Sequence, residues 1–222
     1  MSKLYLVPTP IGNLQDITLR AIEILKKADL ILAEDTRKTG FLLSKLGVKK
    51  PIRSHHKFNE HKILLEITQL ILSGTTVALV SDAGTPGISD PGYLLVRECI
   101  RNQIPFECLP GPTAIIPALV ASGLPTERFC FEGFLPVKKG RMKKLEELKN
   151  ETRTMIFLES PFRLVKTLHQ FAEIFGPDRR GSVSRELTKI YEENIRGTLS
   201  ELIAHYEDKK IRGEIILVLA GK

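Results

Sequence analysis

The stretch TVALVSDAGTPGISDPGYLLVRECIR, residues 76–101, decides the fold class. Its first five residues, Thr76–Val80, form a short apolar run that predicts a buried strand. A loop rich in glycine and proline follows, Ser81–Gly92. Apolar residues at helical spacing then predict a helix over Pro91–Arg101, with Asp90 as its cap and Pro91 in its first turn. A buried strand, a loop and a helix in this order indicate an α/β fold.

The same alternation of strands and helices continues on both sides of this stretch. We expect two α/β domains, residues 1–117 and 118–222, with sheets covered by helices on both faces. The expected strands are 4–7, 30–33, 76–80, 106–109, 129–134, 154–158, 180–184 and 214–220. The expected helices are 18–28, 36–46, 61–72, 91–101, 114–122, 138–150, one that starts at 160, and 200–206.

Composition restricts the class of protein and of partner. The chain has 222 residues and a net charge of +7, from 33 basic and 26 acidic residues, which favours an anionic partner such as nucleic acid. No apolar run approaches the roughly 20 residues of a membrane helix, so we expect no membrane partner and a cytoplasmic location. The cysteines Cys99, Cys108 and Cys130 have neither paired spacing nor a zinc-binding spacing.

Three loops that each follow an expected strand predict a ligand site. They are Pro8–Leu14, Ser81–Gly92 and Pro110–Ala114. In open α/β sheets ligands bind at the carboxyl ends of the strands, where these loops begin. The long loop contains neither the Gly-Lys-Ser/Thr of a phosphate-binding P-loop nor the spacing of a dinucleotide-binding turn. This argues against ATP and against NAD.

The order of the motifs resembles one family along nearly the whole chain. They are VPTPIGNLQDITLRA (7–21), AEDTRKT (33–39), HHKFNE (55–60), LVSDAGTPGISDPG (79–92), PGPTA (110–114), ASGLPT (121–126), FEGFLP (131–136) and RGEIILVLAG (212–221). They resemble the ribosomal RNA small subunit methyltransferase I branch of the tetrapyrrole methylases. The resemblance implies the class III S-adenosylmethionine methyltransferase fold, with the cofactor in the cleft between two α/β domains. It also implies a homodimer that needs no metal.

The resemblance further implies the reaction and the residues that bind the cofactor. The reaction is transfer of a methyl group from S-adenosylmethionine to the ribose 2′-hydroxyl of a cytidine in the decoding region of small-subunit (16S) ribosomal RNA. Either the RNA or the assembled subunit serves as substrate. The cofactor-binding residues are expected to be Pro8, Thr9, Pro10, Asp82, Gly84, Thr85, Pro86, Gly87, Ile88, Ser89, Thr113, Ala114, Leu158, Glu159, Gly213 and Glu214.

The catalytic base and the RNA contacts stay open at the level of sequence. A carboxylate or a histidine near the site could accept the proton of the ribose hydroxyl, and the candidates are Asp35, Glu60, His55 and His56. The residues expected to contact RNA are Arg37, Lys38, His55, His56, Lys57, Arg163, Arg185 and Lys189. Alternatively, Arg37 pairs with Asp35 or Glu34 and orders the turn. The two adjacent histidines lack a third ligand at metal-binding spacing, so we expect no metal site.

Two other functions fit parts of the same pattern. A tetrapyrrole methyltransferase of the precorrin type would share the cofactor loops and differ in its acceptor, but the positive charge and the HHKFNE motif argue against it. A non-catalytic RNA-binding protein could retain the cofactor cleft in degenerate form, but the loops are intact. Assays of cofactor binding and of RNA methylation distinguish the three.

Overall fold

The computed structural model describes residues 3–222, so the first two residues of the expected domain 1–117 lie outside it. Contacts divide the chain into two compact units, Met1–Thr113 and Ala114–Lys222. The division comes four residues before the expected one at 117/118. The reason is that helix α5 (Ile115–Ser122) packs from its first residue on strands of the second unit.

The first unit is built on a five-stranded sheet with the order β3-β2-β4-β1-β5, in which every pair of neighbours is parallel. Its strands are β1 (Leu4–Leu6), β2 (Leu30–Ala33), β3 (Ile52–Ser54), β4 (Val77–Val80) and β5 (Phe106–Cys108). The connecting helices are α1 (Leu19–Lys27), α2 (Thr36–Lys45), α3 (Glu60–Leu72) and α4 (Tyr93–Arg101), and a 3-10 turn, η1 (Leu14–Asp16), precedes α1.

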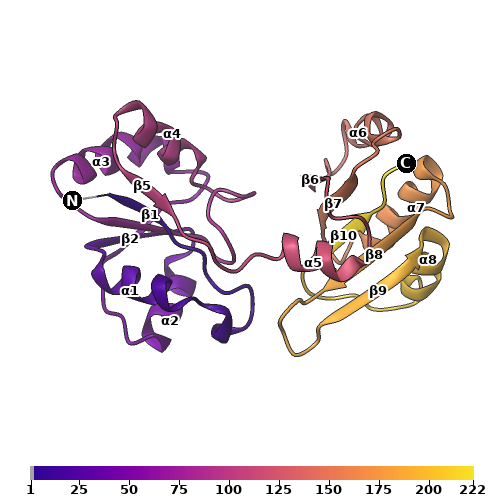
Figure 1. The fold of residues 1–222 in the computed structure, drawn as a ribbon, viewed down its shortest axis with the longest axis horizontal. Helices are drawn as coiled ribbons and strands as arrows, with labels where there is room; N and C mark the ends of the chain where they lie inside the picture. Colours follow the sequence, from indigo (N-terminus) through magenta and orange to yellow (C-terminus); the bar gives the residue numbers. More distant parts are fainter. Residues whose placement is uncertain (1–2) are drawn as a thin grey trace. The chain divides into compact units, whose positions relative to one another are not determined.

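Alternation along the buried strands gives this sheet two apolar faces. In β4, Val77 and Leu79 pack in one core with residues of α3 and α4, whereas Ala78 and Val80 pack in another with residues of α1 and α2. Figure 1 shows the two helix pairs on opposite sides of the sheet. A sheet covered on both faces is what an all-parallel arrangement requires, and the predicted α/β class is confirmed.

The strand order makes two loops diverge at the carboxyl edge of the first sheet. All five strands are parallel, so the loops that follow them meet at one edge. The loop after β1 leads to α1 on one face, and the loop after β4 leads to α4 on the other. Because β1 and β4 are neighbours, their loops diverge at this point. Ligands of open α/β proteins bind at such divergence points.

The second unit has a mixed five-stranded sheet with the order β6-β7-β10-β8-β9. Only the β6–β7 pair is parallel; the other three pairs are antiparallel. Its strands are β6 (Phe129–Phe134), β7 (Thr154–Glu159), β8 (Arg180–Arg185), β9 (Glu193–Thr198) and β10 (Ile215–Leu219). The helices besides α5 are α6 (Arg141–Leu148), α7 (Leu164–Phe175) and α8 (Leu199–Tyr206).

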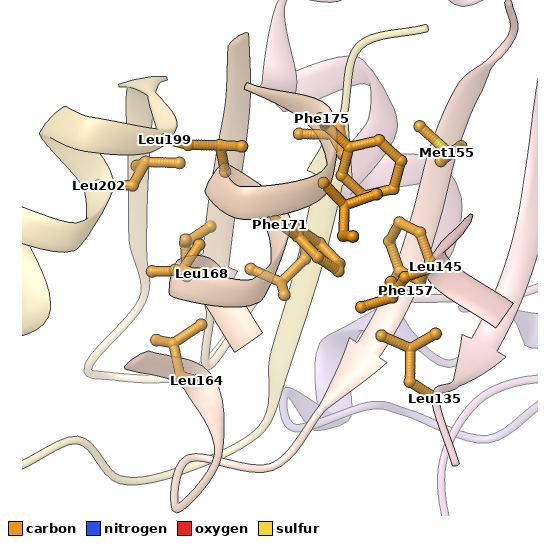
Figure 2. Packing of buried hydrophobic residues seen from close by; sticks show 14 of the residues in the cluster. Leu135, Leu145, Met155, Phe157, Leu164, Leu168, Phe171, Phe175, Leu199 and Leu202 are labelled. Carbon is orange, nitrogen blue, oxygen red and sulfur yellow. The ribbon is translucent and has the colours of Figure 1, made fainter. Parts of the chain in front are cut away.

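Helices cover both faces of this second sheet as well. One face packs against α6, α7 and α8, and the rings of Phe157 and Phe171 lie 4.9 Å apart in that core (Figure 2). The other face packs against α5, where Ala118 and Leu119 contact Ile156 and Val218. Each unit therefore has its own apolar core.

Several element boundaries differ from the sequence predictions. Helix α4 begins at Tyr93 rather than at Pro91, and Asp90 does not cap it, because Gly92 takes the cap position with φ 142°. Helix α7 begins at Leu164 rather than at residue 160, after a turn. Strands β3 and β9 were not predicted. Both are sheet-edge strands without a run of fully buried residues, so their sequences lack the apolar signal of a central strand.

Candidate functional site

The loops after β1 and β4 are bound to each other at the carboxyl edge of the first sheet. Thr9 and Gly84 exchange two backbone hydrogen bonds, of 3.0 and 2.9 Å. The Thr9 side chain is only 1% exposed, and its Oγ1 donates to the Ser81 carbonyl at 3.0 Å. The Ser81 hydroxyl in turn donates to the Gly84 carbonyl at 3.1 Å. These bonds fix the start of the long loop against the first loop.

The third predicted loop joins the same cluster. The Thr85 hydroxyl donates to the carbonyl of Pro112 at 3.4 Å. A Cβ atom on Gly111 would lie 2.7 Å from the Cβ of Pro8, so only glycine permits this approach of the two loops. The three loops predicted from sequence are therefore brought together within the first unit.

Left-handed backbone shapes the rest of the long loop. Gly84 and Gly87 have φ of +79° and +86°, and Ser89 has φ 64°. A Cβ on Gly87 would meet no atom closer than the Tyr93 nitrogen at 3.9 Å, so its backbone can be approached from outside the loop. Of the other expected cofactor residues here, Pro86 is buried and Ile88 is exposed.

Three carboxyl groups, those of Glu34, Asp82 and Asp90, are electrostatically coupled beside these loops. The pKa of Asp90 is raised to about 6, chiefly by burial and next by the charges of Glu34 and Asp82. The pKa of Glu34 is also raised, chiefly by burial and next by Asp82. Glu34 was not among the sequence candidates, and Asp90 was taken for a helix cap. Strands β2 and β4 are neighbours in the sheet, which brings the loops of Glu34 and Asp82 together. No local sequence motif predicts that these two strands are neighbours.

The neighbouring Asp35 has a different environment. It caps α2 by accepting the Arg37 N–H at 2.9 Å, and its carboxylate also accepts from the Arg37 guanidinium at 3.0 and 2.6 Å. The hydrogen bonds from Arg37 hold the pKa of Asp35 far below its usual range. Lys38 donates to Asp82 at 2.7 Å, and the other Asp82 oxygen accepts the Asp35 N–H at 3.0 Å. Arg37 and Lys38 thus order the carboxylates at this edge.

The two predicted histidines, which follow β3, differ sharply. His55 is 1% exposed, neither ring nitrogen has a hydrogen-bond partner within residues 3–222, and burial lowers its pKa. His56 is half-buried, and its Nδ1 accepts the Phe58 N–H at 3.2 Å. Lys57 is exposed, and Glu60 begins helix α3.

In the second unit, Glu159 belongs to a buried polar network. Its carboxylate accepts from the Ser160 N–H at 2.7 Å, from Thr167 at 2.7 Å and from Arg163 at 2.8 Å. The buried Arg141 completes the network, with an N···O distance of 3.3 Å to Glu159. The side chains of Glu159 and Arg163 are therefore occupied within the unit. The preceding Leu158 packs against the α5 side of the sheet.

The other expected residues of the second unit also have partners within it. Gly213 has φ +91°, and a Cβ there would collide with the carboxyl group of Glu186. The Glu214 N–H donates to Glu186 at 2.9 Å, and Lys189 donates to Glu186 and Glu214 at 2.8 and 3.1 Å. Arg185 pairs with Glu193 at 3.1 Å. Thr113 and Ala114 lie on either side of the division between the units.

Residues 3–222 contain neither a candidate metal cluster nor a membrane-spanning helix. They contain no group of three or more His, Cys, Asp or Glu residues that could hold a metal ion. No helix among them is long and apolar enough to cross a membrane.

Comparison with known families identifies the fold family. The model of the tetrapyrrole (corrin/porphyrin) methylases matches residues 3–203. The chain belongs to this family. The resemblance seen in the motifs is confirmed.

Relatives along the whole chain have one common name. A protein of Thermotoga maritima named ribosomal RNA small subunit methyltransferase I is 52% identical over all of both chains. The protein of that name in Haemophilus influenzae is 46% identical over 99% of this chain and 78% of its own length. The one in Escherichia coli O157:H7 is 50% identical over 86% and 67%.

Solved structures share the fold at lower identity. A cobalt precorrin-4 methyltransferase aligns with a TM-score of 0.72 and 19% identity, over 98% of this chain and 94% of its own. A uroporphyrin-III C-methyltransferase of Thermus thermophilus, complexed with S-adenosylhomocysteine, aligns with a TM-score of 0.66 and 23% identity, over 99% and 97%. At this identity the likeness establishes the fold alone.

Proposed function

We propose that this chain is an S-adenosylmethionine-dependent methyltransferase that methylates a ribose 2′-hydroxyl of small-subunit ribosomal RNA. The observation that carries the proposal is the 52% identity to a ribosomal RNA small subunit methyltransferase I over the full length of both chains. Three further points stay predictions from the family resemblance. They are that the methylated nucleotide is a cytidine of the decoding region, that the protein is a homodimer, and that it is located in the cytoplasm.

The residues at the carboxyl edge of the first sheet fit the cofactor chemically. S-adenosylmethionine carries a positive sulfonium, which activates its methyl group, and a positive ammonium. The carboxyl groups of Glu34, Asp82 and Asp90 supply negative charge at this edge. The open backbone of Gly87 allows close approach of a ligand. We propose that Pro8–Pro10 and Asp82–Ser89 bind the cofactor.

Among the carboxylates, Asp90 is best suited to accept the proton of the ribose hydroxyl. A general base works best when its pKa lies near the working pH, and burial has raised that of Asp90 to about 6. Asp35 is unsuitable, because its pKa is depressed and Arg37 occupies both of its oxygens. His55 and His56 are weaker candidates, since one is buried and the other uses Nδ1 to order its own turn.

The residues nearest these carboxylates would keep the charges in place for the reaction. Lys38 and the Asp35 N–H hold the two oxygens of Asp82. Asp82 is therefore held in one orientation, and its charge contributes to the raised pKa of Asp90. Much of the rate of methyl transfer can come from such fixed positioning, on the order of several kcal/mol.

The two alternative functions are less well supported. The tetrapyrrole methyltransferases of known structure are 19–23% identical to this chain. This identity supports a common fold but does not indicate the same methyl acceptor. A non-catalytic RNA-binding protein has no use for a coupled carboxyl group with a pKa of about 6 at the carboxyl edge of the sheet.

The test is to map 2′-O-methyl groups on small-subunit ribosomal RNA from cells with and without this protein. We expect one ribose methyl that depends on the protein. Purified protein with labelled cofactor should restore it to RNA or subunits that lack it. An Asp90→Asn variant serves as the catalytic control and should not restore it. An unchanged methylation map, together with methyl transfer to a tetrapyrrole, would support the alternative enzyme instead.

A further inference from the structure

The turn between β3 and α3, residues 54–60, has a fixed shape. The Asn59 side chain accepts the His56 N–H at 2.8 Å and donates to the Ser54 carbonyl at 3.0 Å. The Asn59 and Glu60 N–H groups both donate to the His56 carbonyl at 2.9 Å. Asn59 thus holds the turn to the end of the strand and to the start of the helix. The backbone from which the side chains of this turn project is therefore held in one conformation.

This fixed turn presents a phenylalanine to solvent. Phe58 is 87% exposed, although burying such a ring in a core would gain roughly 1.5–3 kcal/mol. Its N–H donates to Nδ1 of His56 at 3.2 Å, and the two rings meet edge to face with centroids 6.0 Å apart. One face of the Phe58 ring is not needed for this contact. An exposed aromatic on an ordered turn is a ready stacking surface.

The hydrogen bond from Phe58 also defines the chemistry of His56. Because Nδ1 accepts a hydrogen bond, Nε2 of the neutral ring carries the hydrogen and is a donor. Within residues 3–222, Nε2 has no hydrogen bond or ion pair. This half-buried ring therefore retains one N–H for an external acceptor such as a phosphate or ribose oxygen.

Exposed basic residues flank Phe58 in the sequence. Lys57 precedes it, and His61 and Lys62 follow in the first turn of α3, all three exposed. Glu60 is the one carboxylate of the segment 54–62. The next glutamate of α3, Glu66, is neutralised by two contacts of 2.5 Å with Arg53. A single aromatic ring among cations suits an unpaired nucleotide better than an apolar protein surface.

The turn is also adjacent to the proposed methyl-acceptor site. Strands β2 and β3 pair with Ala33 opposite Ser54, so the loop of Glu34 and the turn of Phe58 start side by side. His56 is close enough to Glu34 for the two side chains to interact electrostatically. An RNA strand whose ribose lies at the carboxylates would therefore have a neighbouring nucleotide within reach of this turn.

We propose that Phe58 stacks on an unpaired base next to the methylated nucleotide, while His56 Nε2 donates to the adjoining phosphate or ribose. The inference rests on the proposed RNA substrate and adds a positioning residue to it. Phe58 holds the strand in register with the carboxylates and takes no part in the transfer of the methyl group.

The test compares Phe58→Ala, Phe58→Leu and Phe58→Trp with the matched control Phe41→Ala. Phe41 is also well exposed, at 67%, but it lies within α2 with its ring near the Lys45 ammonium. The probe is a single-stranded RNA of the methylated segment that carries 2-aminopurine beside the target, whose fluorescence falls when the base stacks. Affinity, fluorescence, methyl-transfer kinetics, cofactor binding and melting temperature are measured for each variant.

We expect Phe58→Ala and Phe58→Leu to weaken RNA binding about 5-fold to 150-fold and to remove the fluorescence decrease. KM for RNA should rise more than kcat falls. Phe58→Trp should restore both, because a larger ring stacks as well or better. Phe41→Ala should behave as the parent protein. Cofactor binding and melting temperature should not change in any of the four variants.

Three results would overturn the inference while the proposed function stands. In the first, Phe58→Ala binds and methylates RNA as the parent does. In the second, Phe58→Leu retains full RNA binding, which indicates an apolar contact without stacking. In the third, Phe58→Ala loses activity only on the assembled subunit, at unchanged RNA affinity, which indicates a protein partner. Failure of the parent itself to methylate RNA would instead refute the proposed function.

Discussion

At the residue scale, the environment of Asp90 separates it from the other acidic residues of the first unit. Burial and two neighbouring carboxylates disfavour its charged form, so its pKa is raised from 3.8 to about 6. The protein therefore keeps a group whose ionisation opposes folding. A loss of stability of this kind is expected at a catalytic carboxylate. The buried charge that lowers the stability of the fold is the same charge that the reaction needs.

Asp90→Asn should lower activity and raise stability. We expect the methyl-transfer rate to fall about 100-fold or more, with loss of its rise through pH 6. The unfolded chain releases the Asp90 proton near pH 3.8, but the folded chain retains it to about pH 6. Ionisation therefore costs stability increasingly between these values and fully above them. The gain in melting temperature of the variant should grow over this range and then level off.

Melting curves and rates measured at a series of pH values test both parts of this prediction. Asp178→Asn, at an exposed site of the second unit, is the control and should change neither quantity. A variant that loses stability at pH 7.5, or that keeps its full rate there, would show that Asp90 is only structural.

At the element scale, the site depends on loops whose shape comes from positive φ angles. Gly84 is the residue that links these loops. Its N–H and its carbonyl both form hydrogen bonds with Thr9, and its φ is +79°. A Cβ there would lie 3.5 Å from Ile11 and 3.7 Å from the Pro112 carbonyl, so the further methyl groups of valine would press on the two adjoining loops. The loops after β1, β4 and β5 thus respond together to a change at one residue.

Gly84→Val should abolish cofactor binding while the protein stays folded. The strained backbone should cost about 1–3 kcal/mol of unfolding free energy. Gly47→Val is the matched control, since Gly47 has φ +66° and no atom within 4 Å of its added Cβ. Both variants should lose similar stability in denaturant titrations. Calorimetry should then find cofactor binding lost only in Gly84→Val; equal binding in the two variants would place the cofactor elsewhere.

The same scale shows what the sequence could predict. Central strands such as β4 were found, because full burial on both faces requires a continuous apolar run. The edge strands β3 and β9 were missed, because half-buried strands need no such run. The three glycine- and proline-rich loops were predicted correctly, because the backbone conformations that require glycine or proline are visible in the local sequence. The electrostatic coupling of Glu34 and Asp90 was not predicted, because it depends on the order of the strands in the sheet.

At the scale of the whole molecule, the excess positive charge is only partly available to a polyanion. Of the cations predicted to contact RNA, Arg163, Arg185 and Lys189 have side chains at most 27% exposed, and all three form ion pairs within the second unit. Arg37 and Lys38 are also paired, but their side chains are 89% and 65% exposed. Net charge could be counted from the sequence, and local pairs such as Arg37 with Asp35 could be proposed from it. The pairs of Lys38 with Asp82 and of Arg185 with Glu193 could not, because they join separate loops or strands. Arg37 and Lys38 are therefore the better test of a phosphate contact.

Replacing Arg37 and Lys38 together by alanine should weaken RNA binding and reduce its dependence on salt. Each lost phosphate contact should flatten the slope of log affinity against log salt by about 0.7 to 0.9. The matched control replaces Lys26 and Lys27 by alanine, which removes the same amount of positive charge. These two lysines lie in the last turn of α1, at the opposite edge of the sheet. We expect the control to keep a slope close to that of the parent. If Arg37 and Lys38 serve only to hold Asp35 and Asp82, the double variant will instead melt at lower temperature with an unchanged slope. Salt titrations and melting curves on the same preparations distinguish these results, since the two roles predict changes in different measurements.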